Sequence, residues 1–329
     1  MRALPGSACP PARLLAGAVE AANTRVMGAT SGLFSHGPYP LADTLAYRGD
    51  PGLFGPGSVT WSVVGDTAVF VGGIRALLLQ AAHPEVAAGV AEHSRYREDP
   101  LGRLSRTAAY VTATSFGAMP EVEWALGMVA RRHRPVRGRS HRDRPYDASA
   151  PGLAAWVHNT LSESFLTCYR FFGPRPLAGA AADRYVTEQA GLGRLLGADP
   201  LPETAAGLSA WIEGHPDLEA SPGSHEALRF LRRPPLPLVV RPAYSVLFRA
   251  AAATLPARVR RILGIGAVPG DIALGRAAVT ALRWSLGSSP DWQLALARTG
   301  GSPPPGISFR QPGPGPARRP SVEPTDVQP

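Results

Sequence analysis

Proline and glycine divide this chain into short apolar segments, and these interruptions are the feature that most limits its fold. The segment REDPLGRLSRTAAYVTATSFG shows it best, because Asp99 suits a helix N-cap, Pro100 the first helical turn and Gly117 the stop. No segment alternates apolar and polar residues as a strand does. The same signals predict further helices over residues 10–32, 66–82, 84–93, 120–135, 151–173, 182–197, 201–215, 224–233, 241–264 and 271–287.

These segments predict an all-α protein with one helical domain. We expect an N-terminal helix and connection over residues 1–44 and a catalytic domain over residues 45–290. Residues 137–149 are predicted to form a loop. Residues 300–329 are rich in proline and glycine, which is typical of a disordered tail.

The basic charge of the chain is concentrated in one segment. The formal net charge is +9, and all 34 basic residues are arginine, since the sequence contains no lysine. Seven arginines and a single acid, Asp143, lie between residues 131 and 144, so this stretch holds +6 of the +9. One alternative is a nucleic-acid-binding patch, but the segment lacks interleaved aromatic residues, and no helix-turn-helix or zinc signature accompanies it. Nucleic acid is therefore not the expected partner.

Several other classes of protein fit poorly. Cys9 and Cys168 are too few and too far apart for a disulfide framework or a thiolate metal site. The first residues lack the apolar run of a signal peptide. Arg75, Arg241 and Arg249 interrupt the most apolar stretches, so no membrane span is expected and a cytoplasmic location is predicted.

Residues 241–266 combine apolar side chains with five arginines. Peripheral membrane contact is one interpretation of this pattern. The other, which we prefer, is an ordinary amphipathic helix pair packed on the core.

His133 stands within the arginine-rich segment, in the sequence RRHRPVRG. Val122, Leu126 and Val129 are spaced by four and three residues, and His133 continues that stripe by four more. The histidine therefore points inward near the end of a helix. It is either a core histidine bonded to a backbone carbonyl or a ligand that the arginines surround.

The helix before it carries a second stripe, of Arg103, Thr107, Tyr110 and Thr114, beside its apolar face. Arg103 and Thr107 are one turn apart and can touch. The pair suits the polar wall of a cavity. The alternative is a half-exposed face with a local bond from the threonine to the backbone.

Three motifs together resemble a known family. LLLQAAHPEVAAGVAEHSRYREDPLGRLSRTAAY, then RRHRPVRG, then YDASAPGLAAWVHNTL are similar to the latex-clearing proteins and mpaB-like oxygenases, across roughly residues 45–290. The resemblance implies an all-α, globin-like fold that holds a b-type haem.

The resemblance also implies roles for individual residues. His133 matches the axial iron ligand, and Arg137 matches the arginine that follows it. Arg103 and Thr107 match the pair beside the haem pocket. Glu85 is the nearest candidate for the acidic base of the distal side. Arginine suits the haem propionates because it binds carboxylates through two hydrogen bonds.

One position departs from the rubber-cleaving members, which carry a lysine directly before the threonine as a distal ligand. Arg106 stands there, and arginine is a poor iron ligand, so we expect an open or water-bound distal site. His158 ranks below His133 as a ligand, and capping or structural roles are expected for His83 and His93. His215, near acidic residues, matches no known zinc spacing.

The sequence therefore predicts a haem b-dependent oxygenase acting on a small apolar substrate, terpenoid or lipid-like, with dioxygen as co-substrate. It does not identify a redox partner.

Overall fold

The structure, a computed structural model, describes residues 28, 32, 36–177, 179–266 and 268–302. The predicted helix over residues 10–32 and the predicted disordered tail from residue 300 lie almost entirely outside this part of the chain.

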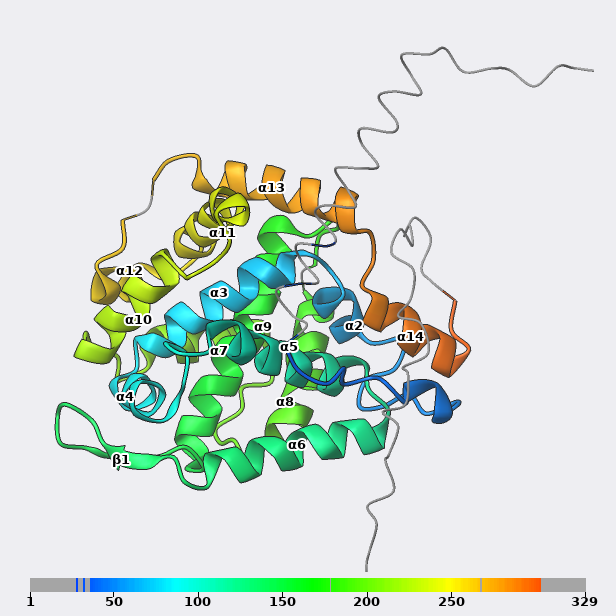
Figure 1. The fold of residues 1–329 in the computed structure, drawn as a ribbon, viewed down its shortest axis with the longest axis horizontal. Coiled ribbons are helices and arrows are strands. Elements are labelled where there is room, and N and C mark those ends of the chain that lie inside the picture. The colour runs from blue at the N-terminus through cyan, green and yellow to red at the C-terminus, as the bar shows by residue number, and fades with distance from the viewer. Residues whose placement is uncertain (1–27, 29–31, 33–35, 178, 267, 303–329) are drawn as a thin grey trace, which may run out of the picture.

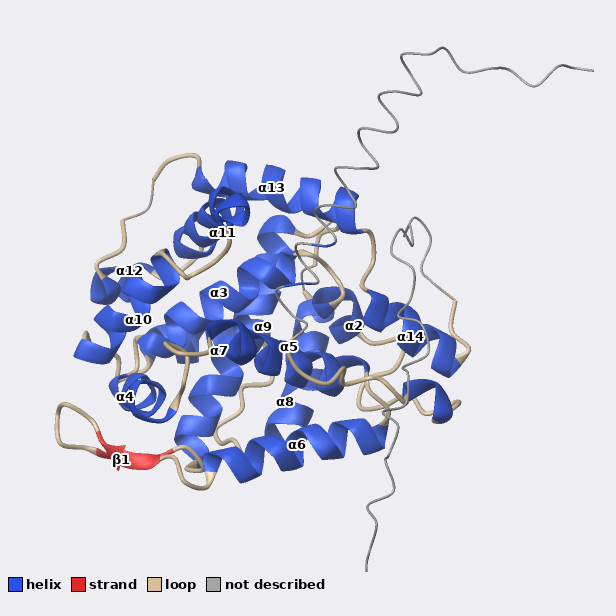
Figure 2. Ribbon diagram, viewed as in Figure 1, coloured by secondary structure: helices blue, strands red, loops and turns tan. Residues whose placement is uncertain are grey.

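The described residues form thirteen α-helices, two 3-10 turns and one two-stranded sheet, which confirms the all-α class (Figure 1, Figure 2). The first elements are η1 (Thr44–Ala46), α2 (Val59–Val64), α3 (Ala68–Ala81), α4 (Pro84–His93), α5 (Pro100–Phe116), α6 (Met119–His133), β1 (Arg137–Arg139) and β2 (Pro145–Asp147). The others are α7 (Pro151–Phe172), α8 (Ala180–Leu195), α9 (Ala205–Gly214), α10 (Pro222–Arg232), η2 (Leu238–Val240), α11 (Arg241–Ala253), α12 (Ala257–Leu263), α13 (Asp271–Leu286) and α14 (Pro290–Thr299).

The core is built around α3, which crosses the middle of the molecule and packs along α7 and α11 (Figure 1). Val71, Leu78 and Leu79 of α3 are fully buried there. The two helices approach closely at Gly72, where an added Cβ would lie 2.7 Å from Cδ1 of Phe165. Glycine is therefore required at this crossing, because a larger residue would push α3 away from α7.

Arg75, which interrupts an apolar run in the sequence, is buried in this core with 1% of its surface exposed. Its guanidinium binds both carboxylate oxygens of Glu163 on α7, and Nη1 also donates to Ser164 Oγ at 2.9 Å. Nε donates to the carbonyl of Thr254 at 3.3 Å. A buried charge needs such partners, so this arginine joins α3, α7 and the end of α11.

The segment proposed for membrane contact forms the helix pair α11 and α12 on the core. Its buried side chains include Phe248, Val259 and Leu263, which favours the packed pair that we preferred. Within the described ranges, no helix is both long and apolar enough to cross a bilayer.

Two predictions of local structure were wrong. The predicted loop over residues 137–149 contains an antiparallel hairpin in which Arg137 pairs with Asp147 and Arg139 with Pro145. Each strand has three residues, too few for an alternating pattern to show in the sequence. The helices α2 and α14 were also missed.

Candidate functional site

Helices α5 and α6 form a hairpin whose turn is fixed by local hydrogen bonds. The predicted N-cap is confirmed, because Asp99 Oδ1 accepts from the Gly102 N–H at 3.0 Å. At the turn, Glu121 Oε2 accepts from the Ala118 N–H at 2.8 Å. The two helices run in opposite directions (Figure 1), so the start of α5 and the end of α6 lie at the same end of the hairpin.

His133 is the last residue of α6 and is half-buried. Burial lowers the pKa of its imidazole below the usual value. Among the described residues, its ring makes no hydrogen bond or ion pair, so it is not bonded to a backbone carbonyl as a core histidine would be. A neutral imidazole keeps a lone pair on one nitrogen, which makes it a competent metal ligand.

The apolar stripe that leads to His133 becomes less buried along the helix. Val122 is fully buried, whereas Leu126 and Val129 are half-buried, and so are Leu101 and Leu104 on α5. The hairpin thus keeps an incompletely covered apolar face at the end that carries His133.

Arg103 lies near the start of α5. Its Nη1 donates to Ser94 Oγ, and its guanidinium carbon is 5.8 Å from the centre of the Tyr96 ring. It forms no ion pair with any carboxylate in the described part of the chain, and burial lowers its pKa. A half-buried guanidinium in this state is suited to an anion.

Thr107 and Arg106 are held locally. The Thr107 hydroxyl donates to the Arg103 carbonyl at 3.1 Å, which is the local bond to the backbone that we weighed. Arg106 Nη1 donates to Asp99 Oδ2 at 2.9 Å, on the exposed side of the helix start.

Glu85, in the first turn of α4, is buried and fully engaged. Arg142 donates to both of its oxygens, at 2.8 and 2.6 Å, and the Ser140 hydroxyl donates to Oε1 at 2.7 Å. These hydrogen bonds outweigh burial and lower the pKa of Glu85 to about 2. In this arrangement Glu85 anchors the β1–β2 hairpin and is not a free base.

Four of the seven arginines in the arginine-rich segment are paired with acids, two of them within the β1–β2 hairpin and two with acids from elsewhere in the fold. Arg137 Nε lies 2.8 Å from Asp147 Oδ2, and Arg139 Nε lies 2.6 Å from Asp143 Oδ1. Arg142 also contacts Asp217 and Glu219, and Arg144 binds Asp217. With four of seven arginines paired, the patch is a weak candidate for a polyanion, and Arg137 already has a carboxylate partner.

His158 and His93 have ordinary structural contacts. The His158 ring, which is 5% exposed, bonds the Gln189 carbonyl of α8 through Nε2 at 2.8 Å. Burial lowers the pKa of His158 to about 4. An added Cβ at Gly193 would lie 2.9 Å from this ring, so α8 packs directly on it. His93 Nε2 lies 3.2 Å from the carbonyl oxygen of Arg137, at the start of strand β1.

The fold also brings together three residues that the sequence did not connect. One ligand-capable atom each from His83, His215 and Asp217 lie within 4.8 Å of one another. His83 ends the turn between α3 and α4, and the other two follow α9. Burial lowers the pKa of His83 to about 4 and lowers that of His215 as well. No spacing rule finds this set, because His83 lies more than a hundred residues before His215 and Asp217.

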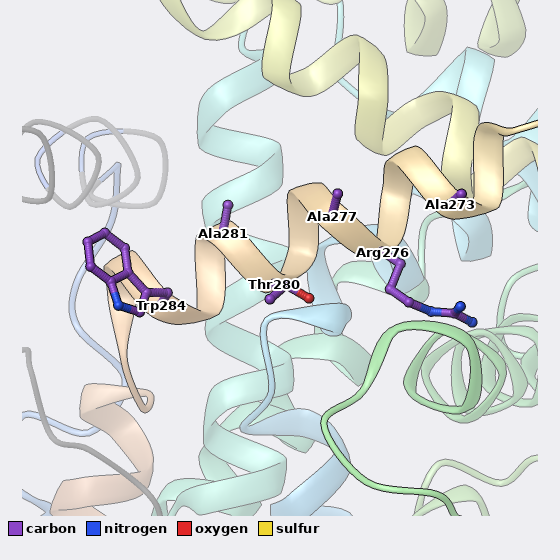
Figure 3. A pocket seen from close by; sticks show the side chains of 6 residues that line it. All are labelled: Ala273, Arg276, Ala277, Thr280, Ala281 and Trp284. Carbon is purple, nitrogen blue, oxygen red and sulfur yellow. The ribbon is translucent and has the colours of Figure 1, made fainter.

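Two hollows lie away from the α5–α6 hairpin. One, of about 670 Å³, follows a single face of α13 from Ala273 to Trp284 (Figure 3). Since one helix supplies all its lining residues, it is a surface feature rather than an enclosed site. The other, of about 280 Å³, is lined by Trp211 and His215 among others, so it adjoins the three-residue cluster at His215.

Comparison with known proteins identifies the family. Residues 61–284 match the family model described as ER-bound oxygenase mpaB/B'/Rubber oxygenase, catalytic domain. The chain belongs to this oxygenase family. The match begins in α2, ends in α13 and lies within the predicted domain of residues 45–290.

The match with the oxygenase family covers His133 and the residues around it, and also the cluster of His83, His215 and Asp217. No curated protein and no solved structure matches the chain.

Proposed function

We propose that this member of the oxygenase family uses haem b and acts on a small apolar substrate, terpenoid or lipid-like, together with dioxygen. The observation that carries the proposal is His133, a half-buried imidazole at the end of α6 without a protein partner among the described residues. Haem b, when bound, supplies the iron centre at which oxygen chemistry takes place.

The chemical groups at the end of the α5–α6 hairpin that carries His133 are of the types that bind haem. His133 offers a neutral nitrogen to the iron, as axial histidines do. The guanidinium of Arg103 has no ion pair with a described carboxylate, so it is available to bind a haem propionate. Charge-assisted hydrogen bonds of this kind are among the stronger ones in proteins. Arg137 fits less well, because Asp147 already binds it.

The half-buried apolar residues of α5 and α6 support the rest of the proposal. A porphyrin and an apolar substrate both gain free energy when such surfaces are covered, by roughly 25 cal/mol for each Å² removed from water. Arg106 is paired with Asp99, and arginine is a poor iron ligand. We therefore propose that the side chain at this position leaves the oxygen-binding position of the iron open.

The test is haem binding by the His133→Ala variant of the full chain. We expect complete loss of bound haem, measured from the absorption spectrum after hemin is added and the excess removed. The fold should persist, with helical circular dichroism unchanged and stability altered by no more than about 1 kcal/mol, because the ring has no described partner to lose.

His225→Ala is the matched control, since this histidine of α10 is exposed. It should bind haem as the parent does. A His133→Ala protein that retains one haem per chain would overturn the assignment, and so would a parent chain that takes up no haem.

A further inference from the structure

His83, His215 and Asp217 form a compact set of metal-ligating groups apart from His133. One ligand-capable atom of each lies within 4.8 Å of the other two. Zinc binds nitrogen and oxygen at about 2.0–2.2 Å, so tetrahedral ligand atoms lie about 3.4 Å apart. Each of the three atoms therefore has to move by no more than about 1 Å to reach one ion.

Two tryptophan rings pack against the two imidazoles of the cluster. The Trp156 ring centre lies 5.7 Å from that of His83 and 4.7 Å from that of His215. The Trp211 and His215 ring centres are 5.0 Å apart, and the two imidazole centres are 5.3 Å apart. Apolar walls of this kind hold ligands in place and limit the access of water to a metal.

His83 supplies an independent sign that the cluster takes a ligand. Its side chain is 5% exposed, and its buried Nδ1 has no hydrogen-bond partner among the described residues. Nδ1 lies 3.3 Å from Glu85 Oε2, but the geometry is not that of a hydrogen bond. A buried polar atom left without a partner costs about 1–3 kcal/mol, and an ion bound to the ring would offset that cost.

Neighbouring groups orient the other two ligands. Arg144 Nη1 donates to Asp217 Oδ1 at 2.5 Å, while no described residue binds Oδ2. Arg258 Nη1 donates to the His215 carbonyl at 2.8 Å, which fixes the backbone of the loop. Such second-layer contacts are typical of metal sites.

The charge around the cluster narrows the class of metal. The carboxylates of Glu85, Asp217 and Glu219 are balanced by the guanidinium groups of Arg142, Arg144 and Arg258. Calcium and magnesium need several oxygen ligands and an excess of negative charge. Two imidazoles and one carboxylate instead suit a divalent transition metal such as zinc or iron(II), with coordination positions left open.

We propose that His83, His215 and Asp217 bind a divalent transition-metal ion at a site separate from that of the haem. The hollow of about 280 Å³ that His215 and Trp211 line adjoins one of the three proposed ligands. The proposal does not depend on haem binding.

The test is calorimetric titration of the chelator-treated, full-length protein with Zn²⁺, with metal content measured after gel filtration. We expect one ion per chain, and a dissociation constant raised about 100-fold or more in His215→Ala and in Asp217→Asn. These two residues are half-buried, so the variants avoid the folding risk of replacing His83.

His225→Ala is again the control, and it should bind Zn²⁺ as the parent does. Haem content, recorded on the same samples, should be unaffected by His215→Ala, which separates this site from the proposed haem site. A parent protein that binds Zn²⁺ no more tightly than His215→Ala and Asp217→Asn would overturn the proposal.

Discussion

His133 and His158 both occupy inward positions on helices, yet their surroundings differ. His158 on α7 is enclosed, bonds the Gln189 carbonyl and has α8 packed against its edge. His133 on α6 is half-buried beside apolar residues that nothing described covers fully. Helical spacing locates a histidine on a helix face, but the groups around the ring decide whether it serves packing or ligand binding.

The contrast between His133 and His158 predicts its largest effect on how the free energy of unfolding depends on pH. The folded-state pKa of His158 is about 4, against 6.5 for a free imidazole, so the unfolded chain binds more protons between these values. Stability is therefore fully present above pH 6.5 and falls as the pH is lowered toward 4. His158 contributes roughly 3 kcal/mol to that loss, measured by urea unfolding across the range.

His158→Gln keeps a donor for the Gln189 carbonyl but does not titrate, so it should lose less stability than the parent as the pH falls. His225→Gln, at an exposed position, should follow the parent. Parallel pH profiles for the parent and His158→Gln would show that the pKa of His158 is not lowered in the folded protein, and the contrast would fail.

A smaller effect is expected at Arg103. Replacing it with alanine should weaken haem binding about 10- to 100-fold, because one charge-assisted bond contributes roughly 1.5–3 kcal/mol. Arg103→Lys should recover part of this affinity, since it keeps the charge but not the two-pronged geometry. Hemin titration followed by absorbance measures both.

The control for Arg103 is Arg132→Ala, which removes an exposed arginine of α6. If it weakens haem binding as much as Arg103→Ala does, general positive charge is responsible and the specific role of Arg103 is wrong.

The smallest effect is expected at Thr107. Its hydroxyl donates only to the Arg103 carbonyl and is exposed, so Thr107→Val should change the free energy of unfolding by about 0.5 kcal/mol or less. Haem content should also be unchanged. A loss of oxygen consumption in such an intact, haem-loaded variant would place Thr107 on the oxygen side, whereas unaltered consumption would leave it a surface residue.

Much of the helical pattern was predictable because caps and breakers are local. Asp99, Pro100 and Gly117 bound α5 as expected, and His133 falls at the end of α6. Pairing between distant segments was not predictable. The acids that neutralise Arg142 come from α4 and from the loop after α9, and the cluster of His83 with His215 depends on the same loop.

The contacts of Arg142 have a mechanical consequence. This one side chain joins the hairpin that follows α6 both to Glu85 and to the loop carrying Asp217 and Glu219. The β1–β2 hairpin after His133 therefore cannot move outward without breaking contacts with two separate parts of the molecule. The end of α6 is thus tethered from beyond the helix, and the His133 ring is not needed to hold it in place.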